Sequence, residues 1–163
     1  MEERVDLAVQ DFYKDEGAWC YGCGRLNTKG HQFRTGWYDN GEQTLTIYKP
    51  LEEHTAAPGF VYGGLIASLI DCHGTGSASL AVHRKNGHEL GDGAELPRFV
   101  TASIKVDFKK PTPHGATLKA IGTIEEIHPK KWKVSVDVYA DEVVCVQGEV
   151  IAVAMPSTFT RGN

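Results

Sequence analysis

Hydrophobic residues recur along this chain with two different periods. In its second half, apolar and polar positions alternate over residues 99–108, 117–128, 131–140 and 143–155, as in strands that bury one face. Two shorter segments, 33–37 and 43–50, are expected to be strands joined by a turn at Asp39-Asn40-Gly41. The strand at 43–50 has Leu45 and Ile47 on one face and hydroxyl-bearing residues on the other. The apolar face of the strand at 99–108 comprises Ala102, Ile104, Val106 and Phe108.

Apolar residues follow a helical period over residues 61–83, which predicts the longest element, a helix of about 35 Å. Gly74 and Gly76 lower the helix propensity there, so we expect close packing against another backbone. A short helix is predicted for residues 3–14, followed by a Gly- and Cys-containing loop over residues 17–30.

The order of these elements is two strands, one long helix and four strands. An antiparallel sheet wrapped around the central helix accounts for that order and makes the fold class α+β. At 163 residues, the chain is most simply one domain over residues 1–163, with the short helix and the Cys/Gly loop in residues 1–30.

The charge and cysteine content limit the function. A net charge of −4 gives no strong field for nucleic acid or an anionic membrane, so neither is an expected partner. No secretory signal is visible at the start, and no stretch reaches the apolar length expected of a membrane span. Four irregularly spaced cysteines favour reduced thiols, so we expect a cytoplasmic protein.

The richest chemical signal lies at the start of the long helix. Gly63 and Gly64 let a ligand approach backbone amides that the helix itself cannot pair, and the helix dipole favours a developing oxyanion there. Asp71 follows two turns later and could activate water or attack directly. This layout is typical of thioester or ester cleavage. Plain alternatives are a solvated Asp71 and glycines that serve only packing.

Three segments resemble hotdog-fold acyl-CoA thioesterases of the hydroxybenzoyl-CoA thioesterase superfamily, especially the phenylacetate-pathway and thioesterase-superfamily-member types. They are residues 58–71, the segment 101–113 with its basic-Pro-x-Pro corner, and the cysteine-glycine loop 20–24 with Asn27 and Gly30. The resemblance covers about residues 18–155 and implies a hotdog fold, with active sites between antiparallel helices of a dimer or a dimer of dimers.

By this resemblance, the amide of Gly63, with Gly64, polarises the thioester carbonyl, and Asp71 is the general base or nucleophile. Thr101 would position water from the partner chain; otherwise it is an ordinary strand threonine. The family usually has His where this chain has Tyr62, and often Asn or Gln where it has Ala56. We expect the Tyr62 hydroxyl to donate in place of that histidine. His54, otherwise a surface residue, would compensate for Ala56.

The basic residues Lys109, Lys110 and His114, with Lys130 and Lys131, lie at two strand ends. They are interpreted either as a solvated rim or as contacts to the phosphates of CoA. The residues predicted to bind the substrate are His54, Lys109, Lys110 and His114.

Cys20 and Cys23 form one C-x-x-C motif, interpreted chiefly as a packing loop near the pocket. A zinc ion needs four ligands, and Cys72 and Cys145 belong to the predicted central helix and a strand, so no metal site is expected. A redox pair is the remaining alternative. Cys72 and His73 are adjacent on the helix and point about 100° apart, which disfavours a Cys–His nucleophile.

The sequence thus predicts an acyl-CoA thioesterase that uses Asp71-activated water and no cofactor, since CoA is part of the substrate. The alternatives are a non-catalytic acyl-CoA-binding hotdog module and, more remotely, a hotdog dehydratase.

Overall fold

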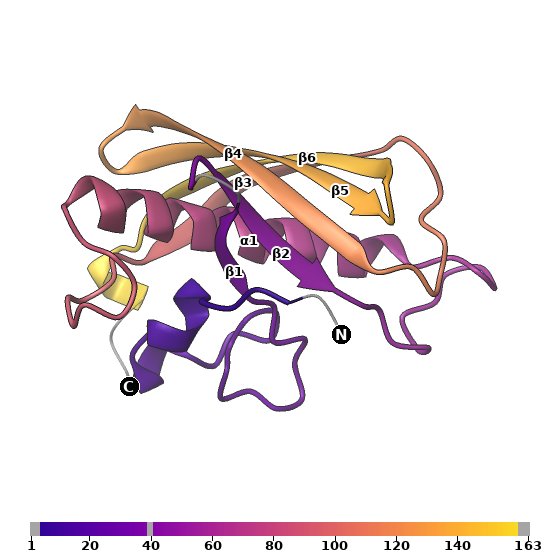
Figure 1. Ribbon diagram of the computed structural model, residues 1–163, viewed down its shortest axis with the longest axis horizontal. Helices are drawn as coiled ribbons and strands as arrows, with labels where there is room; N and C mark the ends of the chain where they lie inside the picture. Colours follow the sequence, from indigo (N-terminus) through magenta and orange to yellow (C-terminus); the bar gives the residue numbers. More distant parts are fainter. Residues whose placement is uncertain (1–3, 39–40, 160–163) are drawn as a thin grey trace.

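The computed structural model describes residues 4–38 and 41–159, and one long helix lies against a six-stranded antiparallel sheet in this part of the chain (Figure 1). The strands follow the order β1-β2-β4-β5-β6-β3 across the sheet. This arrangement confirms the α+β hotdog fold. The elements are β1 (Thr35–Tyr38), β2 (Gln43–Tyr48), α1 (Gly63–Lys85), β3 (Phe99–Phe108), β4 (Leu118–His128), β5 (Lys131–Ala140) and β6 (Val143–Ala154).

The helix α1 is the centre of the fold. The sheet covers one side of it, and the N-terminal segment crosses the other (Figure 1). Gly74 lies where a Cβ atom would collide with the side chain of Val150 on β6, which explains the glycine in mid-helix. By length and composition α1 could cross a membrane, contrary to the sequence-based expectation. However, 67% of its apolar 18-residue stretch is buried inside the fold. The protein therefore has the character of a small soluble domain.

A buried polar layer joins α1 to the first two strands. His73 on α1 contacts the Thr46 hydroxyl through Nδ1 at 2.7 Å and the Thr44 hydroxyl through Nε2 at 3.0 Å. Ser77 lies 2.6 Å from the Thr44 hydroxyl and also donates to the His73 carbonyl. The polar face of β2 therefore faces the helix, while Leu45 on its other face packs beneath the N-terminal segment.

The N-terminal segment is not the single helix predicted for residues 3–14. It contains 3-10 helices at Val9–Phe12 and Asp15–Gly17, separated by extended backbone at Tyr13 and Lys14. Of the apolar residues with the predicted helical spacing, Val5, Ala8 and Val9 are buried, but in two different places, and Phe12 is exposed. Val5 and Ala8 pack on Leu45, whereas Val9 and Tyr13 pack on Leu80 of α1. One short helix cannot reach both clusters, and isolated helices of this length are marginal.

Other boundaries differ from the prediction by one or two residues. The turn predicted at Asp39-Asn40-Gly41 joins two paired strands, with Tyr38 opposite Gln43, although Asp39 and Asn40 lie outside the described residues. The largest departure is in β3, where Ala102 is an extra residue between the paired positions Thr101 and Ser103. This bulge changes which side chains of β3 share a face.

Candidate active site

The chain enters α1 through a tight turn. The amide of Phe60 donates to the Ala57 carbonyl at 2.9 Å, with Pro58 and Gly59 between them. Gly59 has φ +91°, which suits the third position of a type II turn, and proline suits the second. Tyr62 is the N-cap residue, with no side-chain hydrogen bond to the helix start and no acidic residue in the first turn. The Gly63 and Gly64 amides therefore begin the helix without a side-chain cap.

A groove of about 300 Å³ opens beside this helix start. The ring of Phe108 lies over Gly63, where an added Cβ atom would come within 3.0 Å of it, closer than ordinary van der Waals contact. The groove brings together Gly63, Lys109 and Lys110, three of the residues that the sequence singled out. Its lining is Phe60, Val61, Gly63, Ile66, Phe108, Lys109, Lys110, Pro111 and Thr112. Phe108 was missed as a site residue, although a large apolar residue just before the basic-Pro-x-Pro corner is a usable signal.

Asp71 is half-buried on α1 and accepts a hydrogen bond from the hydroxyl of Thr101. The hydroxyl binds Oδ1, and Thr101 is the only hydrogen-bond partner of this carboxylate among the described residues. The contact lies within one chain, whereas the resemblance implied a threonine that acts from the partner. Asp71 and Thr101 therefore form one unit that the sequence did not pair.

Gly63 and Asp71 do not share one site within a chain. Eight residues separate them on the same helix, which corresponds to about 12 Å along its axis. A thioester carbonyl bound at the Gly63 amide is consequently out of reach of a water held by the same chain's Asp71. The two candidate groups therefore lie at separate places on α1, one at its start and one at its middle.

The predicted substrate-binding histidines support the loop that precedes α1. His114 Nε2 donates to the Leu51 carbonyl at 2.9 Å, and His54 Nδ1 accepts from the Leu51 amide at 3.0 Å. Neither lines the groove. The His54 ring lies 6.5 Å from the Tyr62 ring, which is exposed and stands over Gly64.

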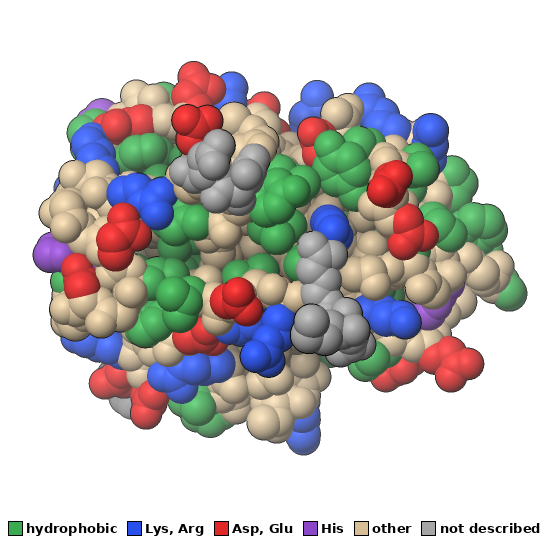
Figure 2. Space-filling view, viewed as in Figure 1, with side chains coloured by type: hydrophobic (Ala, Val, Ile, Leu, Met, Phe, Trp, Pro, Cys, Tyr) green, Lys and Arg blue, Asp and Glu red, His purple; other side chains and the backbone are tan. Residues whose placement is uncertain are grey.

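The two basic pairs lie at opposite ends of β6. The amides of Lys109 and Lys110 donate to the Cys145 carbonyl near its start, whereas Lys131 pairs with Val153 near its end. The lysines at 130 and 131 therefore do not belong to the groove. Figure 2 shows basic and acidic side chains interspersed over one face of the molecule, in keeping with the small net charge.

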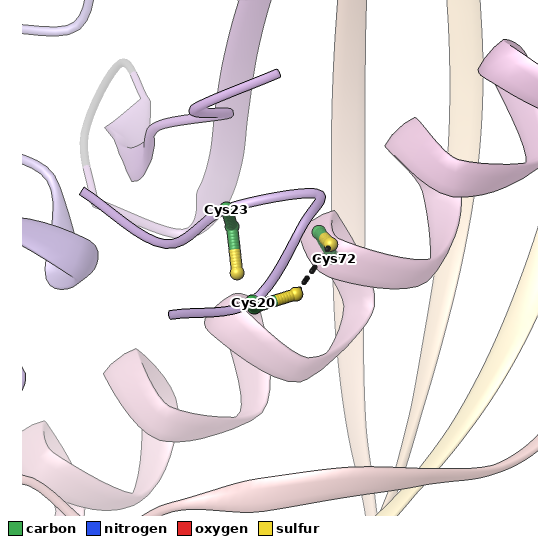
Figure 3. Close-up of side chains that lie close together, drawn as sticks. All are labelled: Cys20, Cys23 and Cys72. Atoms are coloured by element: carbon green, nitrogen blue, oxygen red, sulfur yellow. Dashed lines mark hydrogen bonds between the residues drawn. The ribbon is translucent and has the colours of Figure 1, made fainter. Parts of the chain in front are cut away.

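Cys72 joins Cys20 and Cys23, although these residues are far apart in sequence (Figure 3). Hydrogen bonds from the Cys23 and Cys72 thiols lower the pKa of the exposed Cys20 thiol far below its usual range. The same contacts with Cys20 raise the pKa values of the buried Cys23 and Cys72 thiols.

Comparisons with known proteins show the family of the chain. A family model described as Thioesterase superfamily matches residues 58–147, more than half of the chain. A Thioesterase superfamily protein from Shewanella loihica PV-4 is 45% identical, with 76% of this chain and 91% of that chain covered and a TM-score of 0.62. This chain belongs to the Thioesterase superfamily. Membership supports a thioesterase-type function, and the matched segment contains Gly63, Asp71 and Thr101.

More distant relatives share the superfamily fold. A thioesterase from Haemophilus influenzae is 13% identical, with coverage of 82% of this chain and 85% of that chain and a TM-score of 0.63. An uncharacterized protein from Pyrococcus horikoshii is 25% identical, with coverage of 70% and 76% and a TM-score of 0.53. The search of curated proteins gave no match.

Proposed function

We propose that the protein hydrolyses acyl-CoA thioesters with Asp71 as the general base, without a metal or organic cofactor in the chemical step. The observation that carries this proposal is the hydrogen bond from Thr101 to Asp71 Oδ1. It holds the carboxylate through Oδ1, and no hydrogen bond from another described residue occupies Oδ2, which can accept a proton from water. A positioned carboxylate of this kind is suited to general-base catalysis.

In the proposed reaction, Asp71 removes a proton from water, and the water oxygen attacks the thioester carbonyl carbon. The negative charge that develops on the carbonyl oxygen is stabilised by the Gly63 amide, assisted by that of Gly64. The carbon–sulfur bond then breaks, CoA departs as the thiolate, and the proton held by Asp71 is returned to products. Because a thiolate is a good leaving group, the reaction needs no Lewis acid.

The proposed active unit is a homodimer, either alone or paired with a second one as a dimer of dimers. The separation of about 12 Å between Gly63 and Asp71 along α1 supports this. An antiparallel helix from a second chain would place its Asp71 opposite the first chain's Gly63, and two-fold symmetry would give two equal sites. The outer edge of β3 is also unpaired within the described chain and carries the exposed Ile104.

CoA phosphates are assigned to Lys109 and Lys110, which line the groove that also contains Gly63. The apolar residues Phe60, Ile66 and Phe108 around the same groove suit the thioester end of the substrate. Such a substrate and the free cysteines fit a cytoplasmic enzyme.

The test is release of free CoA from a panel of acyl-CoAs by the purified protein. Asp71→Asn should lower kcat by about 10²-fold or more while the protein stays folded. Asp141→Asn is the matched control, because Asp141 lies in an exposed turn at φ +54°, which asparagine tolerates well. Near-normal kcat in Asp71→Asn would contradict Asp71 as the base.

A non-catalytic acyl-CoA-binding module is the second candidate, favoured by Tyr62 at the position where relatives usually carry His. Binding of acyl-CoA measured by calorimetry, without release of CoA from any member of the panel, would support that function instead.

A further inference from the structure

Three sulfur atoms from distant parts of the sequence meet beside the candidate catalytic residue. Cys20 and Cys23 lie on the loop before β1, and Cys72 lies on α1, directly after Asp71 (Figure 3). The sulfurs all lie within 4.8 Å of one another, and those of Cys20 and Cys72 are 3.9 Å apart. Among the described residues, this is the one such group of potential metal ligands that the structure contains.

These distances suit a thiophilic metal ion. With zinc–sulfur bonds of about 2.3 Å and tetrahedral angles, two thiolates on one zinc ion lie about 3.8 Å apart. The separation of 3.9 Å between Cys20 and Cys72 already has this value, and Cys23 needs only a small movement. Three soft sulfur ligands select zinc over magnesium or calcium, which prefer oxygen.

The loop is shaped to present these sulfurs. The Gly24 amide donates to the Cys20 carbonyl at 2.7 Å, which closes a tight turn around Cys20 and Cys23. A side chain at Gly22 would occupy the place of the Cys72 sulfur, so a glycine is required for the loop to approach α1. The glycine at position 22 thus lets the Cys20–Cys23 turn lie directly against α1 at Cys72.

We propose that Cys20, Cys23 and Cys72 bind one Zn²⁺ ion through three thiolates, with water as the fourth ligand on the exposed side of Cys20. Binding displaces the thiol protons that remain on the three cysteines, so the site gains affinity as pH rises. The ion ties the N-terminal loop to α1 at the residue next to Asp71. Its role is structural: it fixes the position of the middle of α1.

The test uses the purified, reduced full-length protein, stripped with a chelator and then given Zn²⁺. Bound zinc is measured by elemental analysis after desalting, and Co²⁺ substitution reports thiolate ligands through its charge-transfer absorption. We expect one ion per chain. Cys20→Ser should weaken zinc binding by more than about tenfold and, because Cys20 is exposed, should leave the fold intact. Cys145→Ser, which alters a buried free cysteine outside the cluster, should bind zinc normally.

Thermal unfolding gives a readout that is independent of activity. Zn²⁺ should raise the Tm of the wild-type protein and of Cys145→Ser, but not that of Cys20→Ser, because a ligand that binds only the folded state stabilises it. Undiminished zinc binding by Cys20→Ser, or no zinc uptake by the wild-type protein, would overturn the proposal. A disulfide between cluster cysteines that forms in air, with no zinc uptake after its reduction, would also overturn it and indicate a redox pair.

Discussion

The Thr101 hydroxyl donates a hydrogen bond to the Asp71 carboxylate, and a bulge in β3 makes this contact possible. Strict alternation would place Thr101 on the face opposite Val106 and Phe108. The extra residue at Ala102 reverses the phase of the strand, so that Val106 packs into the core, Phe108 lies over Gly63, and Thr101 still reaches the helix. Asp71, the proposed base, and Thr101 are therefore brought together by an irregularity of the strand.

Thr101→Val should lower kcat by roughly tenfold or more, because a hydrogen bond to a charged group is worth about 1.5–3 kcal/mol. Thr101→Ser keeps the hydroxyl and should retain most of the activity. Steady-state kinetics of both variants, with Tm as a check on folding, separates the two cases. Equal activity of the Val and Ser variants would show that the Thr101 hydroxyl does not contribute to catalysis.

Gly63→Pro removes one amide hydrogen from the helix start and should lower kcat by about 10²–10³-fold, the usual effect of losing an oxyanion donor. Proline is tolerated at the first helical position, and the extended backbone of Tyr62 (φ −72°, ψ 144°) is compatible with a following proline. Gly63→Ala is the control, because it makes the same new contact with Phe108 but keeps the amide. If both variants lose activity equally, the contact with Phe108 is responsible, and the amide is not.

A purified heterodimer of one Asp71→Asn chain and one Gly63→Pro chain should recover about half of the wild-type activity. In a two-fold dimer with shared sites, one site then receives an intact Gly63 and an intact Asp71, while the other receives neither. Differently tagged chains allow the heterodimer to be isolated and assayed for CoA release. A heterodimer as inactive as its parent homodimers would contradict a site shared between chains.

The double variant Lys109→Ala/Lys110→Ala should raise KM for acyl-CoA by about tenfold with little change in kcat, because in the proposed complex these two side chains contact the phosphates and not the reacting bond. The KM of the wild-type enzyme should also rise with salt, which screens exposed charges. Lys130→Ala/Lys131→Ala, at the other end of β6, is the control and should leave KM unchanged. Equal effects of the two double variants would indicate only a general electrostatic attraction.

The folded protein should lose stability as pH falls below about 6.5. Burial lowers the pKa of His73 from 6.5 to about 3. The hydrogen-bond partners of its ring among the described residues are the neutral hydroxyls of Thr44 and Thr46. Between these pH values the unfolded chain binds a proton at His73 that the folded chain does not, which destabilises the fold by up to about 1.4 kcal/mol per pH unit. Above pH 6.5 this contribution is constant.

Urea unfolding from pH 7 to pH 4 measures that slope. His73→Gln should flatten the pH dependence, even if the variant is less stable at pH 7, whereas His128→Gln at an exposed position should not. A slope that is unchanged in His73→Gln would assign acid unfolding to other groups.

The periodicity of the sequence was enough to predict the long helix and the four later strands as elements. It did not show that α1 is buried in unbroken runs such as residues 76–80, or that a bulge interrupts the alternation of β3. It left open which face of β2 meets the helix, and it predicted one helix where the N-terminal segment forms two short 3-10 helices. The threonines of β2 face the helix because His73 and Ser77 satisfy their hydroxyls, which no count of apolar residues can reveal. The apolar residues of the N-terminal segment have helical spacing, but Val9 is buried in one cluster and Val5 and Ala8 in another.

For the site, the sequence alone determined the local chemistry: glycine amides at a helix start, and a carboxylate two turns along the same helix. Only the tertiary structure decided which residues meet. It joined Thr101 to Asp71 through a bulge, opened a groove that brings Lys109 and Lys110 to Gly63, and brought Cys72 to Cys20 and Cys23. The physical reason is that spacing fixes directions within one helix or strand, whereas contacts between elements depend on register and packing, to which distant parts of the chain contribute together.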